Sequence, residues 1–352
     1  MSTHTPGAFG RLPTGARLDR IRSSPQFRSH RFQNPVPRRT HPSLAMALRL
    51  LPRWLFGREE RTPRRTLPTF HPDPSHLSAR QETGWRATWL GHSTCLLELG
   101  GVRLLTDPVW SPRVSPLRFA GPVRFHPPPL ALGELPPLDA VLISHDHYDH
   151  LDMETVCTLS TTGVTFVVPL GVGSHLESWG VPALNIVELD WWDSFRLPGS
   201  SVEVAATPAH HLSGRNAVTG RDATLWASFV VRDDSARLFF GGDAGCPTDF
   251  AGIGSRFGPF DLAILPIGAY GEHWPDIHLT PEEAVSAFRD LGGRLLLPIH
   301  WGTFNLAFHD WHEPPERLIE AAREAGIAIA LPLPGQSITS TGPTPVRTWW
   351  DP

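Results

Sequence analysis

Short apolar runs separated by glycine, proline and aspartate dominate the chain from Trp85 onward. Apolar runs of this length, bounded by turn-forming residues, are typical of buried β-strands. In the first half, strands are predicted over residues 87–99, 102–106, 140–144, 164–169 and 186–189. In the second half, they are predicted over residues 202–206, 225–231, 238–241, 262–266 and 295–299.

Helical patterning is clearest in two segments between and after these runs. Residues 281–291 begin with Pro281, Glu282 and Glu283, and proline and acidic side chains favour the first turn of a helix. Residues 315–325 are predicted as a second helix. Strands followed by helices in both halves indicate an α/β (α+β) fold, and no tandem repeat of 20 to 50 residues is visible.

A dense group of metal-ligand side chains follows the predicted strand over residues 140–144. His145 and His147 are two positions apart, so on an extended backbone both imidazoles point the same way and can share one ion. Asp149 and His150 come next, where the chain can turn and aim at a second ion. A histidine-rich turn that binds nothing is the alternative, and the preceding strand disfavours it.

Three more predicted strands lead into isolated ligand-type residues. His210 and His211 follow the strand at 202–206, Asp243 follows that at 238–241, and His300 follows that at 295–299. One histidine after a strand is more often a hydrogen-bonded core residue than a ligand. Recurrence at four strand ends predicts a site for two metal ions.

The order His-x-His-x-Asp-His, then His, Gly-Asp and His resembles the metallo-β-lactamase superfamily of metal-dependent hydrolases. Longer motifs resemble N-acylphosphatidylethanolamine-hydrolysing phospholipase D over roughly residues 85–335. They lie at residues 89–94, 105–108, 121–125, 134–145, 188–192, 256–263, 266–270 and 299–304. The resemblance implies a four-layer αββα sandwich with its site in the crevice between two sheets.

The resemblance also implies roles for individual residues. One ion would be bound by His145, His147 and His211, the other by Asp149, His150 and His300, with Asp243 bridging them. The spacing from Thr207-Pro208 selects His211, with His210 as the alternative. The family places Tyr148 and His278 against the substrate.

The expected reaction is attack of a metal-bridging hydroxide on the phosphodiester of an N-acylphosphatidylethanolamine-like phospholipid, which yields N-acylethanolamine and phosphatidic acid. Asp146 is a general-base candidate, or else it orients neighbouring imidazoles. His278 would polarise the phosphate or merely cap the helix at 281–291, and Tyr148 would contact substrate or pack beneath the loop. Asp107 and His92 are interpreted as supports. Imidazole-rich ligands favour Zn²⁺, with Mn²⁺ or Fe²⁺ as alternatives.

Two other functions are compatible with the same residues. A soluble metal-dependent lactonase or phosphodiesterase would act on a signalling lactone or a sugar phosphate, without lipid preference. A membrane-associated binding protein that has lost turnover is the third hypothesis, and the complete ligand set argues against it.

Charge divides the 352 residues into two predicted parts. Residues 1–80 contain 15 arginines and 4 acidic residues, whereas residues 81–352 contain 16 arginines and 31 acidic residues. We therefore predict a basic, proline-rich extension over 1–80 and a catalytic domain over 81–352. Within the extension, residues 44–56 suit an interfacial helix on anionic lipid. Alternatively, this stretch packs on the catalytic domain or on a second subunit.

Composition excludes several classes. No run of 18 uncharged apolar residues appears, so no membrane span is expected. The three cysteines are scattered, which disfavours a disulfide framework, and Cys246 is interpreted as a small buried thiol beside the site. We expect a cytoplasmic protein, peripheral at most on the inner membrane face, with a phospholipid substrate and no nucleic acid partner. The family resemblance suggests a homodimer.

Overall fold

Two β-sheets form the centre of the computed structural model, which describes residues 7–39, 44–216 and 220–351. The first sheet has seven strands in the order β15-β3-β4-β5-β6-β7-β8. Their bounds are β3 Trp85–Gly91, β4 Thr94–Leu99, β5 Val102–Thr106, β6 Ala140–Leu142, β7 Thr165–Pro169, β8 Ile186–Leu189 and β15 Ser337–Thr339. Neighbouring strands from β5 to β8 are parallel.

The second sheet has six strands in the order β14-β13-β12-β11-β10-β9. Their bounds are β9 Ser194–Arg196, β10 Glu203–Thr207, β11 Ser228–Arg232, β12 Arg237–Phe240, β13 Leu262–Pro266 and β14 Leu296–Ile299. Strands β12, β13 and β14 are parallel to one another. A small hairpin, β1 Phe27–Arg28 and β2 Arg31–Phe32, precedes both sheets in the chain.

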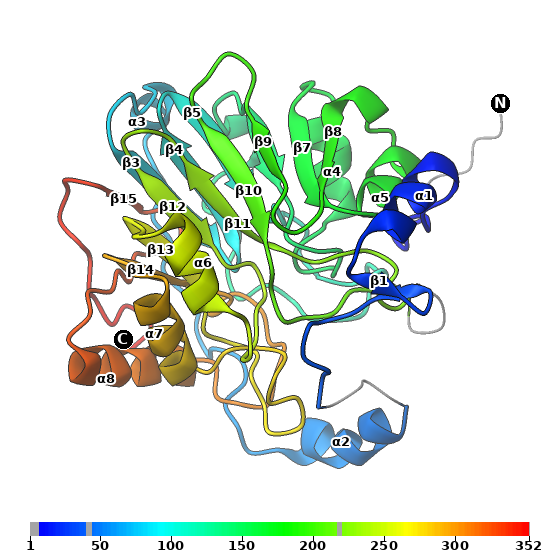
Figure 1. The fold of residues 1–352 in the computed structure, drawn as a ribbon. Helices are drawn as coiled ribbons and strands as arrows, with labels where there is room; N and C mark the ends of the chain where they lie inside the picture. The colour runs from blue at the N-terminus through cyan, green and yellow to red at the C-terminus, as the bar shows by residue number, and fades with distance from the viewer. Residues whose placement is uncertain (1–6, 40–43, 217–219, 352) are drawn as a thin grey trace.

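Helices cover the outer faces of the two sheets (Figure 1). The helices are α1 Gly15–Ser23, α2 Leu44–Phe56, α3 Pro74–Ser78, α4 Met153–Ser160, α5 Gly173–Ser178, α6 Phe250–Phe257, α7 Pro281–Asp290 and α8 Glu313–Ala325. Two 3₁₀ turns occupy Leu132–Glu134 and Ala183–Asn185. Thr280 and Glu283 form the capping box of α7, so the helix predicted at 281–291 begins where proline and acidic residues indicated.

Alternation along β6 shows how the layers are built. Ala140 and Leu142 belong to the core that includes residues of the second sheet, whereas Val141 and Ile143 pack with residues of α4 and α5. On the other side, Phe239 of β12 contacts Phe250 of α6, with ring centroids 6.3 Å apart. The predicted αββα sandwich is therefore confirmed.

The hydrophobic pattern did not predict every strand or its boundaries. The single strand expected over 87–99 is a hairpin of β3 and β4, and His92 lies in its turn with a φ of 51°. Strands β9 and β15 were not expected, because three-residue edge strands leave too short a pattern to detect.

Much of the N-terminal segment packs against the part of the chain that contains the two sheets. Ile21 and Phe32 are fully buried in the main core, and the Phe32 amide donates to the carbonyl of Asp222 at 2.8 Å. Helix α2 lies apart from the sheets in Figure 1. Among the described residues, no helix combines the length and apolarity needed to cross a membrane.

The buried Phe32 provides a test of whether the extension folds as part of the domain. Phe32→Ala should lower the free energy of unfolding by about 3–5 kcal/mol, because it removes a large side chain from the core. Urea denaturation would measure the change, with Phe9→Ala at an exposed position as the control. Equal, small effects of both substitutions would contradict the shared core.

Candidate metal centre

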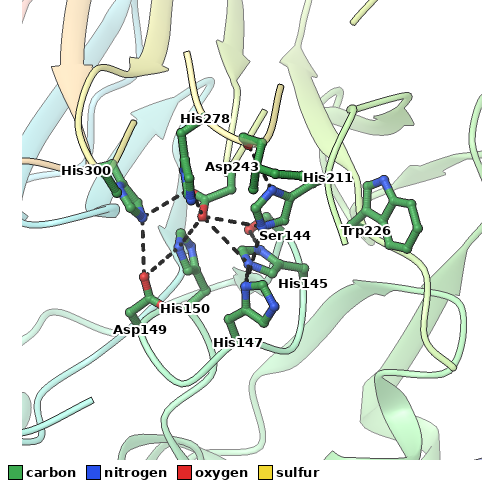
Figure 2. Close-up of polar contacts among 12 residues, drawn as sticks. Ser144, His145, His147, Asp149, His150, His211, Trp226, Asp243, His278 and His300 are labelled. Atoms are coloured by element: carbon green, nitrogen blue, oxygen red, sulfur yellow. Dashed lines mark hydrogen bonds and ion pairs between the residues drawn. The ribbon is translucent and has the colours of Figure 1, made fainter. Parts of the chain in front are cut away.

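Ligand-type side chains from four strand ends meet in one buried cluster (Figure 2). His145 follows β6, His211 follows β10, Asp243 follows β12 and His300 follows β14. The first of these strands belongs to one sheet and the other three to the opposite sheet. The expectation that the four strand ends converge is therefore met by the fold.

The first group of candidate ligands contains three imidazoles. His145 Nε2 lies 2.8 Å from His147 Nδ1, and His211 Nε2 lies 3.4 Å from the same His147 atom. Asp243 Oδ2 is 3.8 Å from His145 Nε2 and 3.6 Å from His211 Nε2. These four atoms surround one position that a single ion can occupy.

The second group lies on the other side of Asp243. Asp149 Oδ2 is 3.3 Å from both His150 Nε2 and His300 Nε2. His92 Nε2 is 3.1 Å from the same oxygen. His92, expected to be a support and not a ligand, is thus part of the second group.

Asp243 stands between the two groups with its carboxylate oxygens divided among them. Its Oδ1 lies 3.1 Å from His300 Nε2, and its Oδ2 lies 3.2 Å from His150 Nε2 as well as near the first group. The preceding Gly242 has a φ of 56°, and a Cβ there would fall 2.4 Å from Cβ of Ser144. The Gly-Asp pair is therefore required to bring this carboxylate between the two sheets.

Buried partners orient the ligand imidazoles. Asp107 Oδ2 is 2.6 Å from His150 Nδ1 and also accepts a hydrogen bond from Ser144 Oγ, which lies 2.9 Å from His145 Nδ1. His211 Nδ1 is 3.1 Å from the carbonyl of Ile277. Such contacts leave the opposite ring nitrogen free for an ion, a geometry that fits the supporting role expected of Asp107.

Burial and neighbouring charges shift the pKa values of the cluster in a way that favours bound cations. Burial and the neighbouring imidazoles hold the pKa of His145 well below 6.5, and burial does the same for His211. Burial also disfavours the charged form of His150, but Asp243, Asp149 and Asp107 outweigh it and raise its pKa well above 6.5. The carboxylates thus favour positive charge here, which a divalent ion would supply.

Unpaired buried atoms, as well as the ligand types, indicate that these residues can hold two ions. Within the described residues, His150 Nε2 and Asp243 Oδ1 are buried and make no hydrogen bond of good geometry, although ion-pair partners lie 3.1–3.3 Å away. Unpaired buried polar atoms are costly, and binding a metal ion would satisfy them. Imidazole and carboxylate ligands suit Zn²⁺, Mn²⁺ and Fe²⁺, so the donor set does not select one metal.

Of the two residues expected to face the substrate, His278 lies beside the cluster, whereas Tyr148 packs against Arg215 and lines a cleft that none of the candidate ligands lines. His278 Nδ1 is 3.7 Å from Asp243 Oδ2, and Thr280 rather than His278 caps α7, so the capping interpretation is wrong. Tyr148 Oη donates to the carbonyl of Arg215 at 2.7 Å, and the Arg215 guanidinium lies 4.0 Å from the tyrosine ring centroid. Tyr148 also lines a cleft of about 270 Å³.

Two other candidates point away from the ligand atoms. The Asp146 carboxylate accepts hydrogen bonds from the Gly214 amide at 2.7 Å and from Thr224 Oγ1 at 3.0 Å, and it lies 3.3 Å from His175 Nε2. These contacts favour a positioning role, and catalysis by Asp146 stays a prediction. His210 Nε2 lies 3.5 Å from Asp276, so His211 is the histidine that joins the cluster.

The interpretation of Cys246 from sequence is also wrong. Cys246 is exposed, not a buried thiol beside the site, because the chain after Asp243 turns outward before α6. Other functional contacts, such as those of His92, were not visible in the ligand pattern. The only signal for His92 was its place in a Gly-His-Ser-Thr turn directly after a strand.

Comparison with known proteins agrees with this geometry. A family model described as "Beta-lactamase superfamily domain" matches residues 102–301. The chain belongs to the metallo-β-lactamase superfamily. It is a metal-dependent hydrolase of that superfamily, and the resemblance to N-acylphosphatidylethanolamine-hydrolysing phospholipase D is confirmed by its relatives.

Two relatives and one solved structure are similar to this chain. An uncharacterized protein of Mycobacterium tuberculosis is 46% identical over 98% of this chain and 92% of its own length. N-acyl-phosphatidylethanolamine-hydrolyzing phospholipase D 1 of Caenorhabditis elegans is 40% identical over 66% of this chain and 68% of its own length. A metallo hydrolase from Ignicoccus hospitalis has a TM-score of 0.57 at 23% identity, covers 73% of this chain and 98% of its own, and shows the shared fold.

Asp243 is the most direct test of the two-ion arrangement. Asp243→Asn should reduce bound metal below two ions per chain and lower turnover by more than about 100-fold, since one side chain serves both groups. Elemental analysis of purified protein would measure the metal content, with Asp234→Asn at an exposed position as the control. Full metal content in Asp243→Asn would rule out the bridging position.

Proposed function

We propose that this hydrolase cleaves the phosphodiester of N-acylphosphatidylethanolamine-like phospholipids and releases N-acylethanolamine and phosphatidic acid. The observation that carries the proposal is the Asp243-bridged pair of ligand groups in a chain that is 40% identical to a relative named for this reaction. When bound, two divalent ions, proposed here as Zn²⁺, would supply a water nucleophile of lowered pKa and neutralise charge that develops on phosphoryl oxygens.

His278 has the properties of a phosphate-orienting group. Burial lowers its pKa to about 4, so at neutral pH its imidazole is uncharged. A neutral imidazole can donate one hydrogen bond to a phosphoryl oxygen but cannot act as a strong proton donor to the leaving group. His278 Nδ1 also lies 3.7 Å from Asp243 Oδ2, and its ring lies near those of His211 and His300, so we assign His278 to binding and orientation of the phosphodiester.

The cleft beside Tyr148 suits the remainder of a lipid substrate. Its lining combines apolar side chains such as Leu117 and Met153 with the charged side chains of Arg113, Asp152 and Glu154. An amphiphile with a charged head and apolar tails matches such a wall. This is the basis for assigning Tyr148 to substrate binding.

Helix α2 supports a membrane-bound substrate over one that is free in solution. Leu48, Trp54 and Phe56 are 61%, 58% and 80% exposed, and the helix contains arginines but no acidic residue. Arg53 joins its end to Glu272 at 2.8 Å, in the loop that leads to His278. We propose that α2 lies on the surface of an anionic bilayer and holds the metal centre near it.

Turnover on competing substrates tests the reaction. Purified, metal-quantified protein should release N-acylethanolamine from N-acylphosphatidylethanolamine in mixed micelles, and chelation should lower the rate by more than about 100-fold. Bis-p-nitrophenyl phosphate and an acyl-homoserine lactone would be assayed in parallel. Metal-dependent activity on the last two substrates alone would replace the proposal with the phosphodiesterase or lactonase function.

The membrane contact has its own test. Trp54→Glu with Phe56→Glu should weaken binding to phosphatidylglycerol-containing vesicles at least about tenfold, because each large apolar side chain contributes about 1.5–3 kcal/mol when buried. Hydrolysis of bis-p-nitrophenyl phosphate should not change. Leu184→Glu, at a leucine that is 88% exposed far from α2 in sequence, is the matched control.

Size-exclusion chromatography of the same variants would test whether a second subunit, and not a bilayer, covers the exposed face of α2. A homodimer remains a prediction from family resemblance. Loss of a dimer without any loss of vesicle binding would assign the exposed face of α2 to a second subunit and overturn the membrane contact.

A further inference from the structure

The loop that presents His211 is held by a segment that lies far away in the sequence. Asn34 Nδ2 donates to the backbone carbonyl of His211 at 2.8 Å, and the His211 backbone amide donates to Asn34 Oδ1 at 3.2 Å. The side-chain amide of Asn34 therefore pairs with both backbone groups of a candidate ligand, as a neighbouring strand would. His211 is fully buried, so loss of these partners would be costly.

The orientation of Asn34 is itself determined by a buried tryptophan. Trp226 Nε1 lies 3.1 Å from Asn34 Oδ1 and 2.9 Å from the carbonyl of Ala209. Trp226, which Figure 2 shows beside His211, is almost fully buried and cannot easily shift. An indole N–H is only a donor, so Asn34 turns Oδ1 and not its amide nitrogen toward Trp226, and Nδ2 then faces the carbonyl of His211.

Arg38 and Arg39, in the same segment as Asn34, bond to the loops that contain Asp222 and Asp276. Arg38 forms a buried ion pair with Asp222, with a second hydrogen bond at 3.0 Å. The Arg39 amide donates to Asp276 Oδ2 at 2.6 Å, and the carbonyl of the adjacent Ile277 faces His211 Nδ1. Residues 34–39 thus connect the backbone of His211 with the loop that orients its ring.

We infer that Asn34 is a positioning residue of the metal centre and that residues 34–39 serve as a clamp for His211. The clamp fixes the backbone of this histidine while Ile277 fixes its ring, so its Nε2 is directed to the position where an ion would be held together with His145 and His147. The basic N-terminal extension then completes the catalytic centre in addition to any contact with lipid. This inference rests on the metal centre and not on the identity of the substrate.

Metal affinity distinguishes positioning from general stability. Asn34→Ala should weaken binding of one of two Zn²⁺ ions by about 10–100-fold, the usual effect of removing a group that orients a ligand, and leave the second ion nearly unchanged. Competition with a chromophoric chelator would measure both affinities. The absorption spectrum of the Co²⁺-substituted protein should change for the ion at the His145, His147 and His211 group.

Two further variants keep the test decisive. Gln33→Ala removes an exposed amide one position away, whose Nε2 donates to the Arg28 carbonyl at 3.0 Å and not to the His211 loop within the described residues, and should leave both affinities unchanged. Asn34→Asp retains the acceptor for Trp226 and the His211 amide but loses the donor, so an intermediate loss is expected. It also serves if Asn34→Ala does not fold.

The inference would be overturned by unchanged Zn²⁺ affinities in folded Asn34→Ala and Asn34→Asp protein. Equal weakening of both ions in the Asn34 and Gln33 variants would also overturn it, because it would indicate general destabilisation. Thermal unfolding of the metal-free proteins provides the reference. Failure of the lipid assay would leave these metal affinities unaffected, so the two hypotheses fail separately.

Discussion

The buried carboxylate of Asp243 is the interaction on which the rest of the structure depends. An ionised carboxylate inside a protein costs several kcal/mol unless cations or hydrogen-bond donors compensate it. Imidazoles from both sheets surround Asp243, and the pKa of its carboxyl lies well below 3.8 because His150, His300 and His278 outweigh burial. The carboxylate holds the two ligand groups together, and two divalent ions would complete the compensation.

Around this centre, rigid contacts limit the movement of each ligand. Asp107 orients His150, Ser144 lies against His145, and the carbonyl of Ile277 faces His211. Three non-glycine residues here, His92, Asp107 and His300, have positive φ angles of 51°, 34° and 64°. Such backbone strain persists only where surrounding contacts over-determine it, and here it accompanies the placement of ligand side chains.

Substrate choice depends on what surrounds the ions. The ligand set is suited to phosphodiesters, lactones and other esters alike, so the metal centre alone supports only the coarser assignment of a metal-dependent hydrolase. The cleft at Tyr148 and the apolar face of α2 are the features that favour a lipid. Both lie outside the ligand groups and join the centre through loops, such as that from Glu272 to His278.

The sequence by itself determined the fold class, the candidate ligands at strand ends and the start of α7, because hydrophobic alternation, ligand spacing and helix capping are local properties. It did not reveal that His92 joins the second group, that Cys246 is exposed or that Asp146 bonds away from the ligands. Nor could it relate Asn34 to His211. Those relations join segments distant in sequence, and only the packing of two sheets and the N-terminal segment brings them within hydrogen-bonding distance.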